Sequence, residues 1–318
     1  MIDSNIEEKS TDMLEHTVTL LWSGGWDGTF RFLQLMDAGV TIRPIYVVDK
    51  ARMGTDYELK AMKEIMKMAS ARFPGKVLDL EFYKKEWILE NCADDQISAA
   101  FKDVRERFQV GKQYEWFALL CKHLGVKMES AVVHQYHGKV EDAISADGRL
   151  ALIKDDFLPE RYVVAAKVDG AGDGAAADGA VVKADGAADG AVVKADGAAD
   201  GAIMKADGAA DGAVSLEEAG KGAGSAGIVF KDIILPVIKL TKKDEENISR
   251  EKGWIDIMEK TWFCHSPING EPCGLCGPCD DAMNTGMEWR MPPAAQKRYK
   301  RKGLHKGIRS LKRRLGVK

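Results

Sequence analysis

The chain has 318 residues, of which 45% are hydrophobic and 30% are charged, a composition typical of one large globular domain or two small ones. It contains no run of 18 apolar residues, which argues against a membrane-spanning helix, so we expect no membrane partner. Residues 1–8 are acidic and polar and lack the apolar core of a signal peptide. These features favour a cytoplasmic protein whose six cysteines are metal ligands or free thiols.

The net charge of −3 conceals an uneven distribution of charge. Residues 297–318 carry eleven Lys or Arg residues and no acidic residue, which leaves 35 basic and 49 acidic residues in the rest of the chain. This basic tail favours contact with nucleic acid or with an acidic protein. A charge run carries no specificity by itself, so a solvated tail, or a helix folded onto the acidic body, explains it at least as well.

The first predicted elements are a buried strand over residues 17–22 and a helix over residues 30–36 that stops at Gly39. The loop between them has the composition of a phosphate-binding loop, because glycines let the backbone approach an anion and the helix N-terminus offers free N–H groups. Asp27 would repel phosphate unless Mg²⁺ lies between them, so we expect a bound Mg²⁺. The alternative is an ordinary tight turn. The expected phosphate ligands are Ser23, Gly24, Gly25, Gly28 and Thr29, with Asp27 placing the metal ion.

The later elements alternate between strands and helices. Strands are predicted over residues 41–49, 77–83, 130–134 and 228–235. Helices are predicted from a capping-box sequence at residues 55–58 to about residue 71, over residues 113–124, and from a cap at Thr241 to just before Gly253. This order predicts an α/β fold with a Rossmann-like parallel sheet and helices on both faces. Ligands bind such sheets at the carboxyl ends of the strands, where the glycine loop lies.

Residues 173–216 interrupt this pattern with an eleven-residue repeat marked by Lys183, Lys194 and Lys205. The repeat is nearly all Ala, Gly and Asp, which cannot bury enough apolar surface to offset the entropy of the chain. We therefore interpret residues 165–227 as a disordered insertion. A short β-solenoid or a Ca²⁺-binding array is the alternative, because repeated Asp-Gly turns also build such structures.

Four cysteines form a C-x8-C-x2-C-x2-C pattern near the end of the chain, and two-residue gaps let consecutive thiolates converge on one ion. Four thiolates complete a tetrahedral Zn²⁺ site and leave no open position, so the predicted role is structural. An iron–sulfur cluster is the main alternative, and a redox-active pair is a further one. The predicted ligands are Cys264, Cys273, Cys276 and Cys279.

Together, the Ser-Gly-Gly-x-Asp loop and the cysteine cluster resemble the 7-cyano-7-deazaguanine synthase family of PP-loop ATP pyrophosphatases. The resemblance covers about residues 17–163 and 228–287, and it implies a PP-loop (HUP-type) fold with a small C-terminal zinc module. The domains that we predict are an ATP-binding domain (residues 1–164 and 228–258), the insertion (165–227), the zinc module (259–296) and the basic tail (297–318).

Further positions match the family's pattern. Asp49 follows the second strand as a family Asp does, which implies a role in cofactor binding, and Glu58 matches a later Glu, although a capping box explains Glu58 equally well. Lys112 lies where the family has an Arg before a helix, and Lys242 matches a Lys after the fifth strand. The resemblance implies that Lys112 and Lys242 stabilise developing negative charge; the alternative for Lys242 is a solvated residue in the first turn of a helix.

The resemblance implies an ATP-dependent C–N ligase. A 7-carboxy-7-deazaguanine-type carboxylate attacks the α-phosphate of ATP, ammonia displaces AMP from the acyl-adenylate, and a second ATP converts the amide into a nitrile, as in queuosine biosynthesis. The small-molecule partners are therefore ATP, free ammonia and the deazaguanine carboxylate, and the family allows a homodimer.

The chain departs from the family's pattern at several positions, because Gly28, Gln135 and Ala282 replace the usual Ser, Gly and Arg, and no Gly follows Asp49. These departures affect substrate identity more than ATP use. They leave open a relative that joins a deazaguanine to a protein or nucleic acid in a defence or modification system, a PP-loop tRNA-modifying enzyme, and a nucleotide-binding module without activity.

Overall fold

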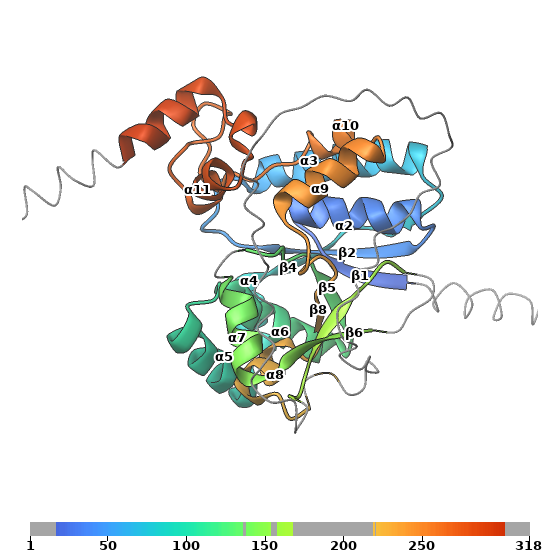
Figure 1. The fold of residues 1–318 in the computed structure, drawn as a ribbon, viewed down its shortest axis with the longest axis vertical. Coiled ribbons are helices and arrows are strands. Elements are labelled where there is room, and N and C mark those ends of the chain that lie inside the picture. Colours follow the sequence, from blue (N-terminus) through green and yellow to red (C-terminus); the bar gives the residue numbers. More distant parts are fainter. Residues whose placement is uncertain (1–16, 136–137, 154–157, 168–218, 220, 303–318) are drawn as a thin grey trace, which may run out of the picture. The chain divides into compact units, whose positions relative to one another are not determined.

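The computed structural model describes residues 17–135, 138–153, 158–167, 219 and 221–302 (Figure 1). The eleven-residue repeat therefore lies outside the described residues, as do residues 303–318 of the basic tail. Within the described part of the chain, no helix is both long and apolar enough to cross a lipid bilayer.

A six-stranded sheet forms the centre of the fold, and every strand pair in it is parallel. The strand order is β3-β2-β1-β5-β8, and β4 also pairs with β2, beyond the end of β3. A separate antiparallel pair is formed by β6 and β7. The strands are β1 (Thr17–Leu21), β2 (Thr41–Val48), β3 (Lys76–Val77), β4 (Glu81–Lys84), β5 (Met128–Ser130), β6 (Arg149–Leu152), β7 (Tyr162–Ala165) and β8 (Ile233–Ile234).

Helices cover both faces of the sheet, as the alternation in the sequence predicts (Figure 1). One apolar cluster unites the first face with the cysteine module, and a second cluster fills the other face. The first face carries α2 (Trp26–Asp37), α3 (Thr55–Arg72), α9 (Lys242–Glu251) and α10 (Ile255–Met258). The second face carries α4 (Lys85–Asn91), α5 (Asp95–Phe108), α6 (Gln113–Leu124), α7 (Lys139–Asp147) and α8 (Gly224–Phe230). The predicted α/β class is therefore confirmed.

The strand order places the glycine loop at the middle of the sheet. Strand β1 lies between β2 and β5, and the chain leaves β2 and β5 toward opposite faces. In open α/β sheets, ligands bind at such a reversal of strand order, outside the carboxyl ends of the strands. The loop that follows β1 is therefore where the fold itself predicts a ligand site.

Three of the predicted strands are wrong in extent. The strand predicted over residues 77–83 is two short strands, β3 and β4, and the strand predicted over residues 130–134 is β5, which ends at Ser130 where β1 also ends. The strand predicted over residues 228–235 is reduced to β8, because residues 228–230 belong to α8. The buried residues Ala226, Val229 and Phe230 of α8 recur at helical spacing. A short apolar run in the sequence does not distinguish this spacing from a buried strand.

Two other predictions about segment boundaries also need correction. The capping box predicted at residues 55–58 does not form, because α3 is preceded by Gly54 and has no side-chain cap. The predicted insertion over residues 165–227 is too long, since Ala165 pairs within the β6–β7 sheet and α8 starts at Gly224. By contrast, the predicted cap at Thr241 is confirmed, with a reciprocal capping box to Asp244.

The C-terminal module follows α10 and contains α11 (Gly277–Asn284), the short 3₁₀-helix η2 (Glu288–Arg290) and a further helix that is described over residues 293–302. Its apolar residues are part of the first core cluster. Met287, Met291 and Ala295 are buried in that cluster together with three of the four cysteines. The module therefore packs on the same core as α2 and α3.

Candidate functional site

The loop after β1 makes a tight turn that leaves the N-terminus of α2 open. Gly24 adopts φ +69°, and a Cβ at this position would lie 2.7 Å from Cγ of Met62, so a side chain does not fit. Gly25 then precedes α2 in an extended conformation and provides no side-chain cap. The first N–H groups of α2 therefore have no capping side chain, as an anion-binding helix terminus requires.

Asp27 and Lys242 meet at this open helix end, although 215 residues separate them in the sequence. Asp27 lies in the first turn of α2, and Lys242 is the first residue of α9. Lys242 Nζ donates a hydrogen bond to Asp27 Oδ1 and lies 3.9 Å from Asp281 Oδ2. Burial disfavours the charged amine, but the surrounding carboxylates outweigh this effect and raise the pKa of Lys242. Lys242 is therefore a fixed positive charge at the end of α2.

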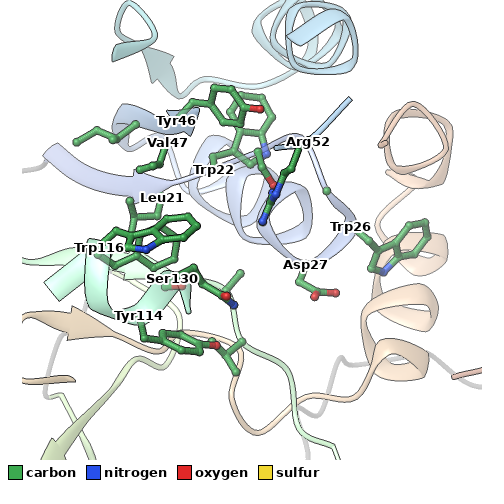
Figure 2. Close-up of a pocket in the computed structure, with 18 residues that line it drawn as sticks. Leu21, Trp22, Trp26, Asp27, Tyr46, Val47, Arg52, Tyr114, Trp116 and Ser130 are labelled. Carbon is green, nitrogen blue, oxygen red and sulfur yellow. The ribbon is translucent and has the colours of Figure 1, made fainter. Parts of the chain in front are cut away.

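Three cavities meet at this position, and each of them is lined by both Asp27 and Gln113. The first has a volume of about 220 Å³ and lies at the carboxyl ends of β1, β2 and β5 (Figure 2). Its walls combine aromatic and aliphatic side chains with the polar and charged groups of Ser23, Asp27, Arg52, Gln113 and Ser130, which suits a flat heterocycle that carries polar groups. Its lining includes Leu21, Trp22, Tyr46, Val47, Arg52, Tyr114, Trp116 and Ser130.

The second cavity is the largest, about 480 Å³, and lies between the glycine loop and the cysteine module. It contains charges of both signs, which suits a polar molecule that carries an anionic group. Its charged and titratable lining residues are Asp27, Arg52, Glu58, Lys242, His265, Asp281 and Arg290. The third cavity, of about 330 Å³, extends from Asp27 toward the N-terminus of α7.

Arg290 is a site residue that the sequence interpretation missed. Its guanidinium lies 4.8 Å from the ring centre of Trp26 and 4.7 Å from that of Phe263, and it donates a 2.9 Å hydrogen bond to the carbonyl of Thr261. Burial lowers the pKa of Arg290 to about 10, so the group remains charged at neutral pH. No local motif marks this arginine, because its partners come from distant segments.

Arg52 and Glu58 form a second charged pair at the edge of the cleft. Arg52 Nη1 lies 3.8 Å from Glu58 Oε1, and the other carboxylate oxygen of Glu58 accepts a hydrogen bond from the hydroxyl of Tyr46. Burial raises the pKa of Glu58, and the hydrogen bond from Tyr46 and the positive charge of Arg52 only partly oppose this shift. Glu58 is therefore placed at the site, while the helix-capping role that we also considered does not apply.

The structure brings most of the predicted loop residues to the cleft, but not all of them. Ser23, Gly25, Asp27 and Gly28 line the first cavity. Thr29 is fully buried, its Oγ1 accepts a 3.1 Å hydrogen bond from Trp22 Nε1, and it lines none of the three cavities. The predicted phosphate contact of Thr29 is therefore wrong, because its hydroxyl is buried in the core, where it accepts the hydrogen bond from Trp22.

Lys112 and Asp49 lie near the cleft but outside the walls of the three cavities. Lys112 is exposed at the start of α6, where the adjacent Gln113 takes the position in the cleft. Asp49 pairs with Lys85 at 3.4 Å and accepts a 3.1 Å bond from the backbone N–H of Ala51. Both remain predictions as site residues, without direct support from the cavity walls.

Glu245 is a further buried group that the sequence interpretation missed. It lies one turn after Lys242 on α9, is fully buried, and neither of its carboxylate oxygens has a hydrogen-bond partner among the described residues. Burial and the nearby charge of Asp27 raise its pKa well above the usual range, although Lys242 acts in the opposite direction. Burial therefore favours the neutral, protonated form of the carboxyl group beneath the Asp27–Lys242 pair.

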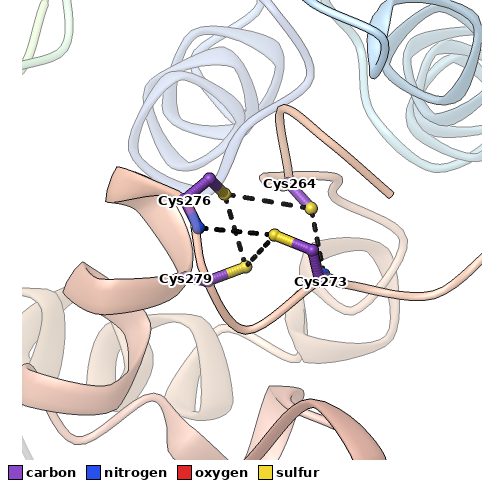
Figure 3. A group of neighbouring side chains, drawn as sticks. All are labelled: Cys264, Cys273, Cys276 and Cys279. Atoms are coloured by element: carbon purple, nitrogen blue, oxygen red, sulfur yellow. Dashed lines mark hydrogen bonds between the residues drawn. The ribbon is translucent and has the colours of Figure 1, made fainter. Parts of the chain in front are cut away.

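The four predicted cysteine ligands converge on one point, where they could hold a metal ion such as zinc (Figure 3). Their sulfur atoms all lie within 4.8 Å of one another. Sγ of Cys276 lies 3.9 Å from that of Cys264 and 3.5 Å from that of Cys279, and Cys273 lies 3.9 Å from Cys279. Tetrahedral Zn²⁺ with Zn–S bonds of about 2.3 Å requires sulfurs about 3.8 Å apart, so the cluster fits that ion.

Backbone groups support this cluster. The N–H of Cys273 points at Sγ of Cys264 at 3.2 Å, and the N–H groups of Leu275 and Cys276 point at Sγ of Cys273 at 3.3 Å and 3.4 Å. Such donors stabilise thiolates, which are the form that binds a metal. The geometry is therefore that of a closed site without an open coordination position, as expected for a structural metal.

The cysteine module contacts the glycine loop directly. The N–H of Trp262 donates a 3.0 Å hydrogen bond to the carbonyl of Gly24, and the indole of Trp262 donates to the carbonyl of Cys264 at 2.8 Å. A Cβ at Gly54 would lie 2.4 Å from that same carbonyl oxygen, so the start of α3 also touches the module closely. The cysteine cluster and the glycine turn are thus connected through Trp262.

Comparisons of the chain with protein-family models, with curated proteins and with solved structures found no match.

Proposed function

We propose that the chain is a PP-loop ATP pyrophosphatase that activates a carboxylate as its adenylate and transfers the acyl group to ammonia. The observation that carries this proposal is the convergence of Asp27 and Lys242 at the uncapped N-terminus of α2, between an aromatic cavity and a charged one. A nucleotide that spans the two cavities would have its phosphates at this helix end.

The first cavity is the proposed adenosine site. Its aromatic walls offer stacking area, and its position beside β1 leads directly to the glycine turn. Backbone N–H groups of the turn and of α2 would then bind the β- and γ-phosphates. Ser23 adds a hydroxyl donor at the same edge.

Asp27 and Lys242 have complementary tasks in this arrangement. Asp27 is the residue that would hold Mg²⁺, since it is a carboxylate at the phosphate end of the cleft. Bound Mg²⁺ would supply charge neutralisation at the phosphates. Lys242, released from its bond to Asp27, can then donate to an oxygen of the α-phosphate or of the departing pyrophosphate.

The second cavity is the proposed acceptor site. Arg52 and Arg290 offer guanidinium groups for a carboxylate, and Glu58 and Asp281 offer acceptors for ring N–H and amino groups. A deazaguanine carboxylate carries both kinds of group on one planar ring, and this supports the family's substrate class. Gly277 and Pro278 of the cysteine module close the cavity on one side.

The reaction balances without a nucleophilic side chain. The carboxylate oxygen attacks the α-phosphorus and pyrophosphate leaves, which gives the acyl-adenylate. Ammonia adds to the acyl carbon, loses a proton to solvent, and AMP leaves, which gives the amide. In the nitrile-forming variant, the amide oxygen attacks the α-phosphorus of a second ATP, pyrophosphate leaves, and loss of AMP and of both N–H protons gives the C≡N bond. The protein contributes positioning and charge stabilisation.

A second candidate function is transfer of the activated deazaguanine to an amine of a macromolecule. One observation favours it: α11 supplies Asp281 to the wall of the second cavity and bonds the basic C-terminal helix through Asp280, with Lys302 Nζ 3.1 Å from Asp280 Oδ1. An acceptor polymer bound to the basic helix would therefore be separated from the cleft by α11 alone.

Lys242 and its neighbour Lys243 offer a matched test of the proposal. Lys242→Met should lower the rate of pyrophosphate release by about 100-fold or more, because it removes the fixed charge at the phosphates. Lys243→Met should leave the rate within about twofold, because Lys243 is exposed and, among the described residues, its ion pair is with Glu246 on its own helix. Equal rates for the wild-type chain and a folded Lys242→Met variant would refute the proposed role.

A further inference from the structure

The C-terminal helix over residues 293–302 is firmly fixed to the cysteine module on one of its faces. Arg298 donates to the carbonyl groups of Cys273 and Pro272 at 2.8 Å and 3.0 Å. Lys302 pairs with Asp280, and Ala295 is fully buried. Residues 297–302, the first part of the basic tail, are therefore held against the cysteine module by these contacts.

The opposite face of this helix presents three cations to solvent. Lys297, Lys300 and Arg301 are exposed, and their spacing of three and four residues places them side by side on one helical face. Among the described residues, none of the three takes part in an ion pair, whereas Arg298 and Lys302 are engaged on the docked face. Within the part of the chain that the structure describes, no acidic side chain neutralises the charge of this face.

We propose that the face formed by Lys297, Lys300 and Arg301 is a docking surface for the phosphate backbone of a nucleic acid. Fixed cations with no acidic neighbour on the helix are sufficient for such binding, which derives mainly from the release of counterions. The described part of the helix has no large exposed apolar residue, which a protein interface would normally use as an anchor. Residues 303–318 add six Lys or Arg residues and no acidic residue to the sequence.

The helix that carries the basic face lies close to the cleft, because another helix, α11, contacts both of them. Lys302 bonds Asp280, the first-turn neighbour of Asp281 on α11, and Asp281 lines the second cavity. A nucleic acid held on the basic face would therefore run along the outer side of the module that closes the cavity. Binding of a nucleic acid at this face requires neither ATP nor turnover, so it can be measured separately from the proposed adenylation reaction.

The test compares two triple variants of the full chain that lose the same charge. The first is Lys297→Gln, Lys300→Gln and Arg301→Gln. The control is Lys60→Gln, Lys63→Gln and Lys67→Gln, which removes three exposed lysines from the surface of α3. Fluorescence anisotropy with a labelled single-stranded RNA and a labelled DNA duplex, between about 50 mM and 200 mM salt, measures affinity and its salt dependence.

We expect the first variant to bind at least about tenfold more weakly than the control at low salt. Its log–log salt slope should be smaller by about 2 for the single strand and about 3 for the duplex, because three phosphate contacts are lost. Equal affinity and slope in the two variants would refute the basic face as the binding surface. Tighter binding of a labelled poly-glutamate peptide than of either nucleic acid would also overturn the proposal, in favour of an acidic protein partner.

Discussion

At the scale of single residues, the site depends on charges that the fold brings together from distant segments. The sequence points to Asp27 through a local pattern, the glycine loop, and to Lys242 only through the match with a Lys of the family that the chain resembles. Arg52, Arg290 and Glu245 lie in no such pattern. Their importance follows from contacts across the chain, such as the position of Arg290 between Trp26 and Phe263, which no local spacing predicts.

Glu245 provides a stability prediction with a defined sign. Its pKa is higher in the folded chain than in the unfolded one, mainly because of burial. As the pH rises above about 4.5, the unfolded chain loses this proton while the folded chain keeps it, so the free energy of unfolding falls by up to about 1.4 kcal/mol per pH unit. Glu245→Gln should therefore stabilise the protein at pH 7 and leave it nearly unchanged at pH 4.

Glu246 is the matched control, because its pKa is shifted in the other direction. Burial opposes its ionisation, but the bonds from Arg250 and Lys243 outweigh this effect and lower the pKa. Glu246→Gln should therefore destabilise the protein at pH 7, and the loss should shrink as the pH falls through the folded pKa. Urea unfolding of both variants from about pH 4 to pH 8 measures the two trends. A destabilised Glu245→Gln variant at neutral pH would show that the carboxylate has a favourable partner.

At the scale of elements, the sequence predicted the bounds of two capped helices better than those of the short strands, and it gave no prediction for α4, α5, α7, α8, α10 and α11. Helices α6 and α9 carry capping and periodic signals over ten or more residues, and their predicted extents are confirmed. Strands β5 and β8 have only three and two residues, and their lengths are set by pairing with β1 and β5. The apolar runs around them do not contain that information, since a short buried helix such as α8 has the same composition.

The link between the cysteine module and the glycine turn predicts that loss of the metal ion affects the nucleotide site. Metal analysis should find about one zinc per chain. Cys276→Ser should lower both zinc content and ATP affinity, because the cysteine-bearing segment positions the bond from Trp262 to the carbonyl of Gly24. The control is Cys92→Ser, whose buried thiol lies outside the cluster.

Two results would contradict this coupling. Iron with visible absorbance in place of zinc would identify a different metal centre. Unchanged ATP affinity in a zinc-free, folded Cys276→Ser variant would show that the module and the glycine turn are independent.

At the scale of the whole molecule, the α/β sheet and its ligand edge could be predicted from the sequence, but the cleft could not. Alternating strands and helices predict the parallel sheet and a ligand at the carboxyl ends of its strands, whereas the order β3-β2-β1-β5-β8, which places the glycine turn at the reversal point, comes from the structure. The second cavity depends on how residues 262–290 fold back against α2, and that arrangement is fixed by the shared apolar core. The sequence therefore identifies some residues of this cavity, such as Asp27 and Lys242, but not Arg52, Asp281 and Arg290, which join them only in the folded chain.

The repeat is predicted to be dispensable for the fold. Deletion of residues 173–216 should leave the melting temperature and the rate of pyrophosphate release nearly unchanged, because the flanking elements β7 and α8 already pack into the core through Val163, Val164 and Ala226. Circular dichroism and a pyrophosphate assay measure both quantities. Loss of either one in the deletion variant would show that the repeat contributes to the folded structure.

The most direct test of the central claim is a single incubation of the purified, zinc-loaded chain with Mg-ATP, ammonium and 7-carboxy-7-deazaguanine, followed by mass spectrometry of the small molecules. Our account predicts AMP, pyrophosphate and the deazaguanine amide or nitrile from the wild-type chain. It predicts none of these from Asp27→Asn, while the control Asp37→Asn at the far end of α2 retains activity. If the folded wild-type chain forms no AMP and no pyrophosphate, the adenylation mechanism is contradicted.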